Sequence, residues 1–473
     1  MNLRYYLWMA LERFGANGIS FVSNICLSYF VVPEEYGIVA ALAIFTNIIF
    51  VLVDCGLSDG IMRYENATNR DFNTLFWFNA MSGSTLCLFY NVLAPFVADY
   101  LKMPECENVM RVLGFAAILS ALAISQATKM RYELRFKRMS LINLLAVISM
   151  ALTCNLMGWL GLGYWAVVML TFGHSFFMLF YLVLFTKWNL RFEFSKNTFK
   201  DLWGFGIHLL FTVLTTQVSQ YLYSFLLGKQ NVKQAGYFGQ AQKLENAPMR
   251  SLESTITYTS YVMMTKECDK EKRRNYLLYI YGIISAILLA FVGAAFSLCE
   301  PVIYLIFPSK WYPVVPYFEL LIILGFFQAM SRFQQNIYKT YNRTNVLARL
   351  VLVENLVLIL SCIVLFYVFS VDVYVIIICS IIITALMNLI SLYIGSKLSE
   401  VNFVKFIKRL LPTIFIAIVS AIMTLFTIKT IESNMLALSL GLCVYVISYM
   451  GLGVIIMPSV FKPMLSRFKR KKS

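Results

Sequence analysis

Long, uninterrupted runs of apolar residues recur along the chain, and they restrict its fold more than any other feature. Ile283–Leu298 and Val373–Ile383 are two examples. A helix needs about 20 apolar residues to cross about 30 Å of hydrocarbon. Because backbone N–H and C=O groups must be paired within the protein in lipid, the crossing segments are helices or a closed barrel. Barrel strands alternate apolar and polar residues, and these runs do not, so the sequence predicts helices.

The composition agrees with this prediction. Of the 473 residues, 60% are hydrophobic and 14% are charged. A soluble domain carries about 25% charged residues, and its surface is too large to be covered by so apolar a chain. We therefore predict an all-α membrane protein with about fourteen transmembrane helices. The predicted spans are 10–32, 36–57, 74–98, 109–127, 139–160, 163–185, 202–227, 235–263, 276–299, 314–338, 347–369, 373–396, 410–430 and 436–457.

The distribution of positive charge supports this count. With the N-terminus inside, cytoplasmic segments hold about 31 of the 40 lysines and arginines, and outside segments hold about six. Losing one span would destroy the alternation from that point onward. Three spans, 10–32, 235–263 and 314–338, are the most polar, so hydropathy alone would miss some of them. We predict a multi-pass membrane protein with both termini in the cytoplasm.

Two lobes and an extension are expected from the span count. Residues 1–200 form an N-terminal six-helix lobe, residues 201–400 a second six-helix lobe, and residues 401–473 two additional helices and a basic cytoplasmic tail. Tyr36-Gly37 and Gly236-Tyr237 fall at matching places in the two halves. This weak echo is compatible with the internal repeats of transporters.

Several classes of function are disfavoured. The net charge of +16 comes from short basic clusters between apolar runs, so no nucleic-acid partner is predicted. The ten cysteines contain no C-x-x-C pair, and no metal site or cofactor is predicted. His174 and His208 lie in different predicted spans, where packed or interfacial positions are expected. Paired acids, an activated nucleophile and a large outer loop are missing from the sequence pattern, so no enzyme is predicted.

Charged residues inside the predicted spans are the most informative residues for function. Each costs about 2.5–3.5 kcal/mol on insertion scales, so it usually faces a cavity or a partner. The eighth span carries the most. At 100° per residue, a polar stripe falls within an arc of roughly 140°; it consists of Gln240, Lys243, Asn246, Arg250 and Glu253. Such a stripe lines a water-filled cavity, or it forms a polar seam in which Lys243 and Arg250 pair with Glu245 or Glu253.

Other charges in the spans leave more than one interpretation open. Arg13 either joins the stripe or reaches the cytoplasmic interface near the start of its span. Arg332 fits either end of the tenth span. Asp54 and Glu354 lie near span ends, where interfacial placement is the simpler interpretation. A cation-lined cavity suits an anionic substrate, because arginine and lysine both bind phosphate.

The sequence resembles the Wzx-type (WzxC-like) polysaccharide flippases of the multidrug/oligosaccharidyl-lipid/polysaccharide (MOP) exporter superfamily. The resemblance covers most of the first twelve spans, and the order of its motifs makes it specific. The motifs are Val32–Gly37, Asp54–Ser58, Arg131–Lys137, Gly161–Val168, Gly236–Leu244 and Trp311–Pro316.

This resemblance implies a fold like that of the MATE transporters and the lipid II flippase, with the last two spans peripheral. It also implies a flippase that moves an undecaprenyl-diphosphate-linked oligosaccharide across the bacterial inner (cytoplasmic) membrane for surface polysaccharide biosynthesis. The movement would use alternating access of a cation-lined cavity. The expected substrate-binding residues are then Arg13, Gln240, Lys243, Asn246, Arg250 and Arg332. Expected partners are the lipid-linked substrate, membrane lipids, a polysaccharide polymerase and glycosyltransferases.

The main alternative is a multidrug or cation antiporter of the same superfamily. Such a protein needs acidic residues for proton or sodium coupling, and Asp54 and Glu253 are the candidates. The cations of the eighth span count against it. A membrane polymerase or ligase would need a sizeable outer loop, and a scaffold subunit would not need charges within its spans.

Overall fold

The computed structural model describes residues 3–186, 188, 190–266, 269–369, 371–458 and 460–461, and most side chains from Glu12 onward. These residues form helices and connecting loops, with no strand among them, so the predicted all-α class is confirmed. Contacts divide the chain into two compact units, Met1–Gln240 and Ala241–Ser473.

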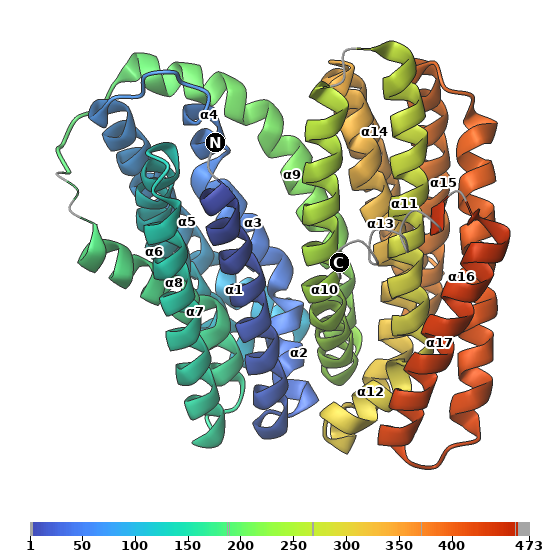
Figure 1. Cartoon of the computed structure of the whole chain (residues 1–473). Coiled ribbons are helices and arrows are strands. Elements are labelled where there is room, and N and C mark those ends of the chain that lie inside the picture. Colours follow the sequence, from blue (N-terminus) through green and yellow to red (C-terminus); the bar gives the residue numbers. More distant parts are fainter. Residues whose placement is uncertain are drawn as a thin grey trace. The chain divides into compact units, whose positions relative to one another are not determined.

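The first unit contains the helices up to the beginning of α10 (Figure 1). Their bounds are α1 Leu3–Phe30, α2 Pro33–Ala41, α3 Ala43–Asp54, α4 Leu57–Ile61, α5 Asn69–Leu101, α6 Glu105–Tyr132, α7 Phe136–Trp159, α8 Tyr164–Phe185, α9 Lys196–Gln230 and α10 Val232–Lys266. Within this unit, α5 packs on α6, and α7 packs on both α8 and α1.

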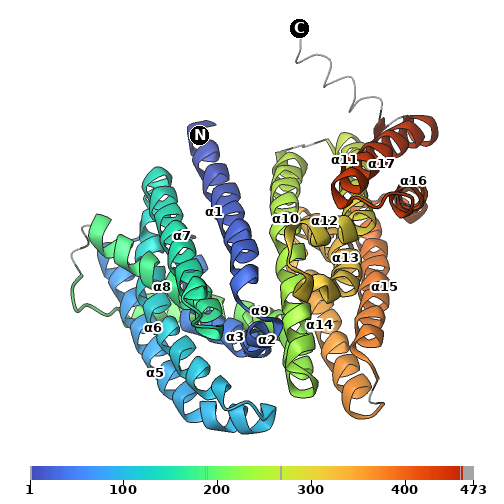
Figure 2. The ribbon, with the colours of Figure 1, turned by 90° about the horizontal axis from the view of Figure 1, so that it is seen from below.

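The second unit contains the rest of α10 and the helices that follow it. Their bounds are α11 Lys270–Ser297, α12 Cys299–Ile306, the 3-10 helix η1 Ser309–Val314, α13 Val315–Thr340, α14 Thr344–Tyr367, α15 Val373–Ser399, α16 Phe403–Lys429 and α17 Asn434–Ile456. Figure 2 shows α16 and α17 side by side.

Eleven helical segments of the described chain are long and apolar enough to cross a membrane. The helices α1, α9 and α10 are not among them, although they are 28, 35 and 35 residues long. Two of these three, α1 and α10, are predicted to be among the most polar spans. The protein is a multi-pass membrane protein, and the count of fourteen spans stays a prediction.

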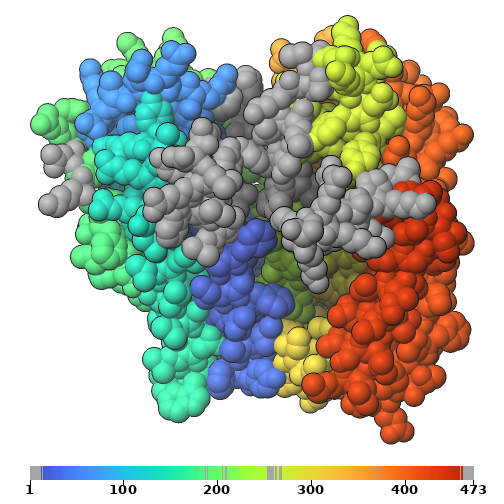
Figure 3. Space-filling model, in the orientation of Figure 1, coloured from blue at the N-terminus to red at the C-terminus, as the bar shows by residue number. Residues whose placement is uncertain are grey.

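Large apolar side chains cover much of the surface, as a lipid solvent requires. On α16, whose surface is visible together with that of α17 in Figure 3, the exposed side chains include Leu411, Phe415, Ile418, Ile422 and Phe426. The opposite face of α16 carries Phe406, Ile416 and Ala417 into the core of the second unit.

The last two helices belong to that core. Tyr445 and Tyr449 of α17 are buried, and their hydroxyls donate to the carbonyl oxygens of Leu289, at 3.3 Å, and Ala286, at 2.7 Å. Both carbonyls lie on α11. The two helices lie at the end of the sequence, but they pack into the core of the second unit and are not peripheral to it.

The boundary between the compact units falls inside α10, whereas the sequence-based division begins its second lobe at residue 201. Helix α9 packs on α2, α3, α4 and α5, which places it in the first unit. The beginning of α10 joins it there through a close helix crossing. A Cβ atom on Gly37 would meet the carbonyl oxygen of Val232, and one on Gly236 would meet that of Pro33.

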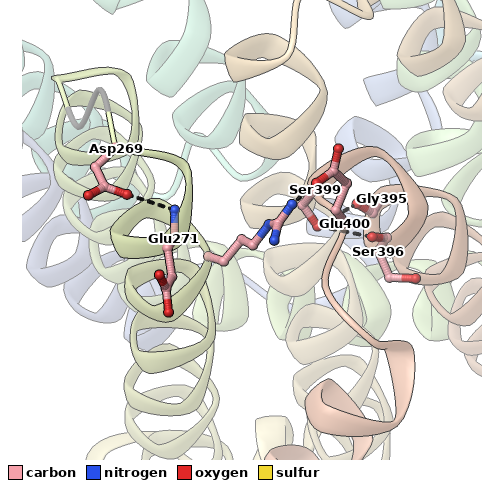
Figure 4. A network of polar contacts seen from close by, with 7 residues as sticks. Asp269, Glu271, Gly395, Ser396, Ser399 and Glu400 are labelled. Atoms are coloured by element: carbon pink, nitrogen blue, oxygen red, sulfur yellow. Dashed lines mark hydrogen bonds and ion pairs between the residues drawn. The ribbon is translucent and has the colours of Figure 1, made fainter.

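Ion pairs and helix caps organise the loops of the second unit (Figure 4). The Asp269 carboxylate caps α11 by accepting from the backbone N–H groups of Glu271, at 2.9 Å, and Lys272, at 3.2 Å. Arg274, one turn further along, forms an ion pair with Glu400 at the end of α15. This pair connects the ends of two helices outside the apolar runs.

The crossing of α2 and α10 predicts a large effect from a single methyl group. Gly236→Ala should destabilise the protein by about 1–3 kcal/mol, because the Cβ has to push two helix backbones apart. The thermal unfolding midpoint of the purified protein in detergent measures this. Gly18→Ala is the matched control, because a Cβ there meets nothing within 4 Å. Equal midpoints for the two variants would contradict the prediction.

Candidate functional site

The predicted polar stripe lies on α10, which contains Pro248 in its interior. Lys243 and Arg250 are exposed, and Asn246 is half-buried. The Nε of Arg250 donates to the Oδ1 of Asn246 at 2.7 Å, and the Nδ2 of Asn246 donates to the carbonyl oxygen of Gln242 at 2.8 Å. The amide therefore orients the guanidinium along one face of the helix. The structure brings Arg250 and Asn246 together as the periodicity predicts.

Gln240 occupies a different environment at the end of the first unit. Its side chain is fully buried, and neither its amide nitrogen nor its amide oxygen has a hydrogen-bond partner among the described residues. A buried polar group without a partner costs about 1–3 kcal/mol. The buried amide of Gln240 is thus unfavourable for folding, and a water molecule or a polar ligand that bonded to it would reduce this cost.

The acidic side chain of Glu245 is also buried, at 8% exposure. Its carboxylate lies against Gly325 of α13, where a Cβ would collide with Oε1. Glu245 therefore connects α10 to α13. The predicted seam that pairs Lys243 and Arg250 with Glu245 or Glu253 stays a prediction, and the side chain of Glu253 lies outside the described residues.

Arg332 lies on α13 and is half-buried. Its guanidinium acts electrostatically on the carboxyl group of Glu354, which lies on α14. Glu354 lies in the interior of α14, which runs from Thr344 to Tyr367, and its predicted placement at the membrane interface stays a prediction. Arg332 and Glu354 are close enough to interact electrostatically within the second unit.

Arg13 is a residue of α1, and its side chain lies outside the described residues. The side chain of His208 on α9 does as well. For Arg13 and His208 the structure therefore gives the helix but not the position of the side chain. That Arg13 joins the polar stripe of α10 stays a prediction.

The sequence reasoning missed a polar network around Glu12. The Glu12 carboxylate accepts from the Oγ of Ser140 at 3.0 Å and from the Nδ2 of Asn143 at 3.2 Å. The Oδ1 of Asn143 lies 3.4 Å from the Nε2 of His174. These contacts join α1, α7 and α8. Ser140 and Asn143 are three positions apart on α7, so they lie on one face of that helix. This spacing of two polar residues was the sequence signal for the network.

Asp54 lies at the end of α3, where the second predicted span is interrupted. Cys55 and Gly56 adopt positive φ angles of 49° and 76°, and α4 begins at Leu57. The Asp54 carboxylate accepts from the backbone N–H of Ser58, at 3.2 Å, and from its Oγ, at 2.5 Å. Asp54 is half-buried near the end of its span, close to where the sequence predicts it.

Within the described part of the chain, no three His, Cys, Asp or Glu residues could hold a metal ion together. Nine cysteines are described there, and all of them are free thiols. The tenth, Cys268, lies outside the described residues.

Solved structures of two other membrane proteins share this fold. The lipid II flippase MurJ in an inward closed conformation matches with a TM-score of 0.75 and 12% identity, covering 97% of this chain and all of that one. An inward-facing MATE multidrug transporter of the MOP superfamily matches with a TM-score of 0.63 and 15% identity, covering 83% and 98%. The chain therefore has the fold that MurJ and this MATE transporter share.

The sequence comparison identifies the family. Residues 26–316 match the polysaccharide biosynthesis protein family, and the chain belongs to that family. Teichuronic acid biosynthesis protein TuaB of Bacillus subtilis (strain 168) is 21% identical over 286 residues, which are 59% of this chain and 59% of TuaB. The match thus spans less than two thirds of that relative. Lipopolysaccharide biosynthesis protein WzxC of Escherichia coli (strain K12) is 22% identical, over 71% of this chain and 72% of its own. The predicted resemblance is confirmed.

The network around Glu12 predicts a stability effect. Asn143→Leu should lower the free energy of unfolding by about 1–3 kcal/mol, because Glu12 loses a donor in a low-dielectric environment. Thermal unfolding in detergent measures it. Ser149→Ala is the control: it removes a 2.8 Å hydrogen bond to Tyr181 between α7 and α8, two of the three helices that the network joins, without affecting a carboxylate. If both variants unfold at the same temperature, the network contributes no more than an ordinary hydrogen bond.

Proposed function

We propose that this protein is a flippase for an undecaprenyl-diphosphate-linked oligosaccharide in surface polysaccharide biosynthesis. It would move the sugar-diphosphate head from the cytoplasmic to the outer leaflet of a bacterial inner membrane by alternating access of a central cavity. The prenyl chain would stay in lipid during this movement. The family and the MOP transporter fold support the proposal.

The observation that carries the proposal is the pair of exposed cations on α10. Lys243 and Arg250 are exposed side chains on one helix of a membrane protein, and a charge within a membrane span usually faces a water-filled cavity or a partner. A diphosphate supplies acceptor oxygens for both, and Arg250 is held in place by Asn246. In this proposal Arg13, Gln240 and Arg332 contribute to the same substrate site, and no cofactor is needed.

The lobes that move would correspond to residues 1–200 and 201–400 of the span-based division, or to the compact units that divide within α10. A polysaccharide polymerase and glycosyltransferases are the proposed partners, because a flipped unit has to be made on one side and used on the other.

Arg250 provides the central test. Arg250→Ala should abolish surface polysaccharide in a strain that lacks the chromosomal copy, while the amount of protein in the membrane stays normal. Arg250→Lys should retain part of the activity, because lysine keeps the charge but not the bidentate donors. Surface polysaccharide per cell is the measurement.

Arg274→Ala is the matched control, because it removes an arginine of the same unit whose partner is Glu400 in a loop. An exposed pair of this kind contributes little, so export should continue. Intact export in Arg250→Ala would show that the stripe is a structural seam.

A cation-coupled multidrug antiporter is the second candidate. The buried acid Glu245 and the half-buried Asp54 favour it, as does the match to a MATE transporter. Drug transport by the purified protein in vesicles, without any effect on surface polysaccharide, would favour this candidate over the flippase.

The proposed topology has its own test. Alkaline phosphatase joined after Lys310 should be active, because that segment is predicted outside, and the enzyme joined after Lys272 should be inactive. Green fluorescent protein at the C-terminus should fluoresce. The reverse pattern would overturn the cytoplasmic placement of the termini. Equal activity of the two phosphatase fusions would overturn the single span predicted between these points.

A further inference from the structure

The first turns of α16 carry three cations on one side of the helix. Lys405, Lys408 and Arg409 fall within an arc of about 100°, at 100° per residue. Lys405 and Lys408 are exposed, and Arg409 is half-buried. The ion pairs of the described residues include none of the three. The beginning of α16 therefore presents a face whose positive charge no acid of the described chain balances by an ion pair.

Arg409 is the most constrained of these cations. Its side chain lies against Gly282 of α11, where a Cβ atom would meet the Cδ of Arg409 at 3.1 Å and its Nη1 at 3.2 Å. One turn earlier on α16, Phe406 is fully buried and packs edge-on against Tyr281, with ring centroids 5.0 Å apart. The Nη1 of Arg409 is buried and has no hydrogen-bond partner among the described residues. A charged donor in this state is unfavourable, so the position favours a ligand that brings acceptor oxygens.

Two acidic side chains at this end of the second unit have other partners. The Asp269 carboxylate caps α11 through the backbone N–H groups of Glu271 and Lys272. Glu400, at the end of α15, forms its ion pair with Arg274 (Figure 4). Both carboxylates are thus engaged on α11, and the cations of α16 remain available to an anion from outside the chain.

Below the cations, α16 presents a row of exposed apolar side chains. The row contains Leu411, Phe415, Ile418, Ile422 and Phe426. It covers about 22 Å at 1.5 Å per residue, more than the roughly 15 Å of one leaflet in a 30 Å hydrocarbon core. At 100° per residue, Lys408 lies at the edge of this row. The helix therefore offers cations at one end and a hydrocarbon surface beneath them, which matches the distribution of charge and acyl chain in an acidic phospholipid.

We propose that Lys405, Lys408 and Arg409 bind the phosphate of an anionic phospholipid, whose acyl chain lies along the apolar row of α16. Arginine offers paired donors to phosphate oxygens, and lysine adds a point charge. Basic pockets between membrane helices bind acidic headgroups in this way. In the predicted topology this end of the unit faces the cytoplasm, and six further lysines and arginines follow Phe461 in the sequence.

Other ligands fit this surface less well. A zwitterionic phospholipid would bring an ammonium group among the cations of α16, where like charges repel. Inorganic phosphate would satisfy the guanidinium of Arg409 but would leave the apolar row unused. The lipid site lies on α11 and α16, and it does not rest on the proposed function, which assigns the substrate to α10.

Thermal unfolding of the purified full-length protein in a neutral detergent tests the binding. Phosphatidylglycerol is titrated into the detergent, and phosphatidylcholine with the same acyl chains is the comparison. We expect phosphatidylglycerol to produce a saturable rise in Tm of about 2 °C or more, because a ligand that binds only the folded state stabilises it. Phosphatidylcholine, and sodium phosphate at matched ionic strength, should leave Tm unchanged.

Charge-removing variants locate the site. Lys408→Gln changes an exposed side chain, so it should fold normally, and it should raise the phosphatidylglycerol concentration at half-effect about fivefold, the ratio expected for one cation near an acidic lipid. Arg409→Gln should raise it at least about tenfold, because the paired donors are lost, and Arg409→Lys should restore part of the affinity. Lys429→Gln is the matched control, because it removes one exposed charge from the opposite end of the same helix. It should keep the full response.

Four results would overturn the proposal. They are equal responses to the two lipids, a response to phosphate as large as that to phosphatidylglycerol, unchanged half-effect concentrations in both Lys408→Gln and Arg409→Gln, and a loss in Lys429→Gln as large as that in Lys408→Gln.

Arg250→Ala separates this site from the proposed function. The variant should keep the full response to phosphatidylglycerol while it loses surface polysaccharide. Loss of the lipid response in Arg250→Ala would place the lipid on α10 and overturn the site on α16. Intact polysaccharide together with an intact lipid response would reject the proposed role of Arg250 and leave the lipid site standing.

Discussion

A charge carried into lipid must be hydrated, paired or surrounded by hydrogen-bond donors, and this constraint accounts for most of the polar structure in the protein. Glu12 has two donors from α7, Asp54 has donors from α4 and α5, and Arg332 has Glu354 as its electrostatic neighbour. Each arrangement draws on another helix of its own unit. The helices are held in register by these polar contacts as well as by apolar packing.

The face of α10 that carries Lys243 and Arg250 differs from these arrangements in its exposure. Both side chains are exposed, and Arg250 is oriented by an amide of its own helix. The same helix contributes to both compact units, because its first turns cross α2 through Gly236 and its later turns place Glu245 against Gly325.

Sequence periodicity was sufficient where a site lies on one helix. The positions of Lys243, Asn246 and Arg250 follow from 100° per residue, and the bond between Arg250 and Asn246 is a contact between residues four apart. Periodicity was insufficient where a site uses several helices. Glu12, Asn143 and His174 are far apart in the chain and come from three helices.

The sequence by itself determined that the chain lives in lipid and forms long helices, because apolar runs and backbone hydrogen bonding leave no other solution. It also determined the family, through motifs whose order survives at low identity. The tertiary structure decided which helices join which unit and where the second span breaks. It also decided which side chains donate hydrogen bonds to each charged group within the helices. These outcomes depend on contacts between distant segments, such as the approach of Gly236 to Pro33, and local residue patterns do not encode such contacts.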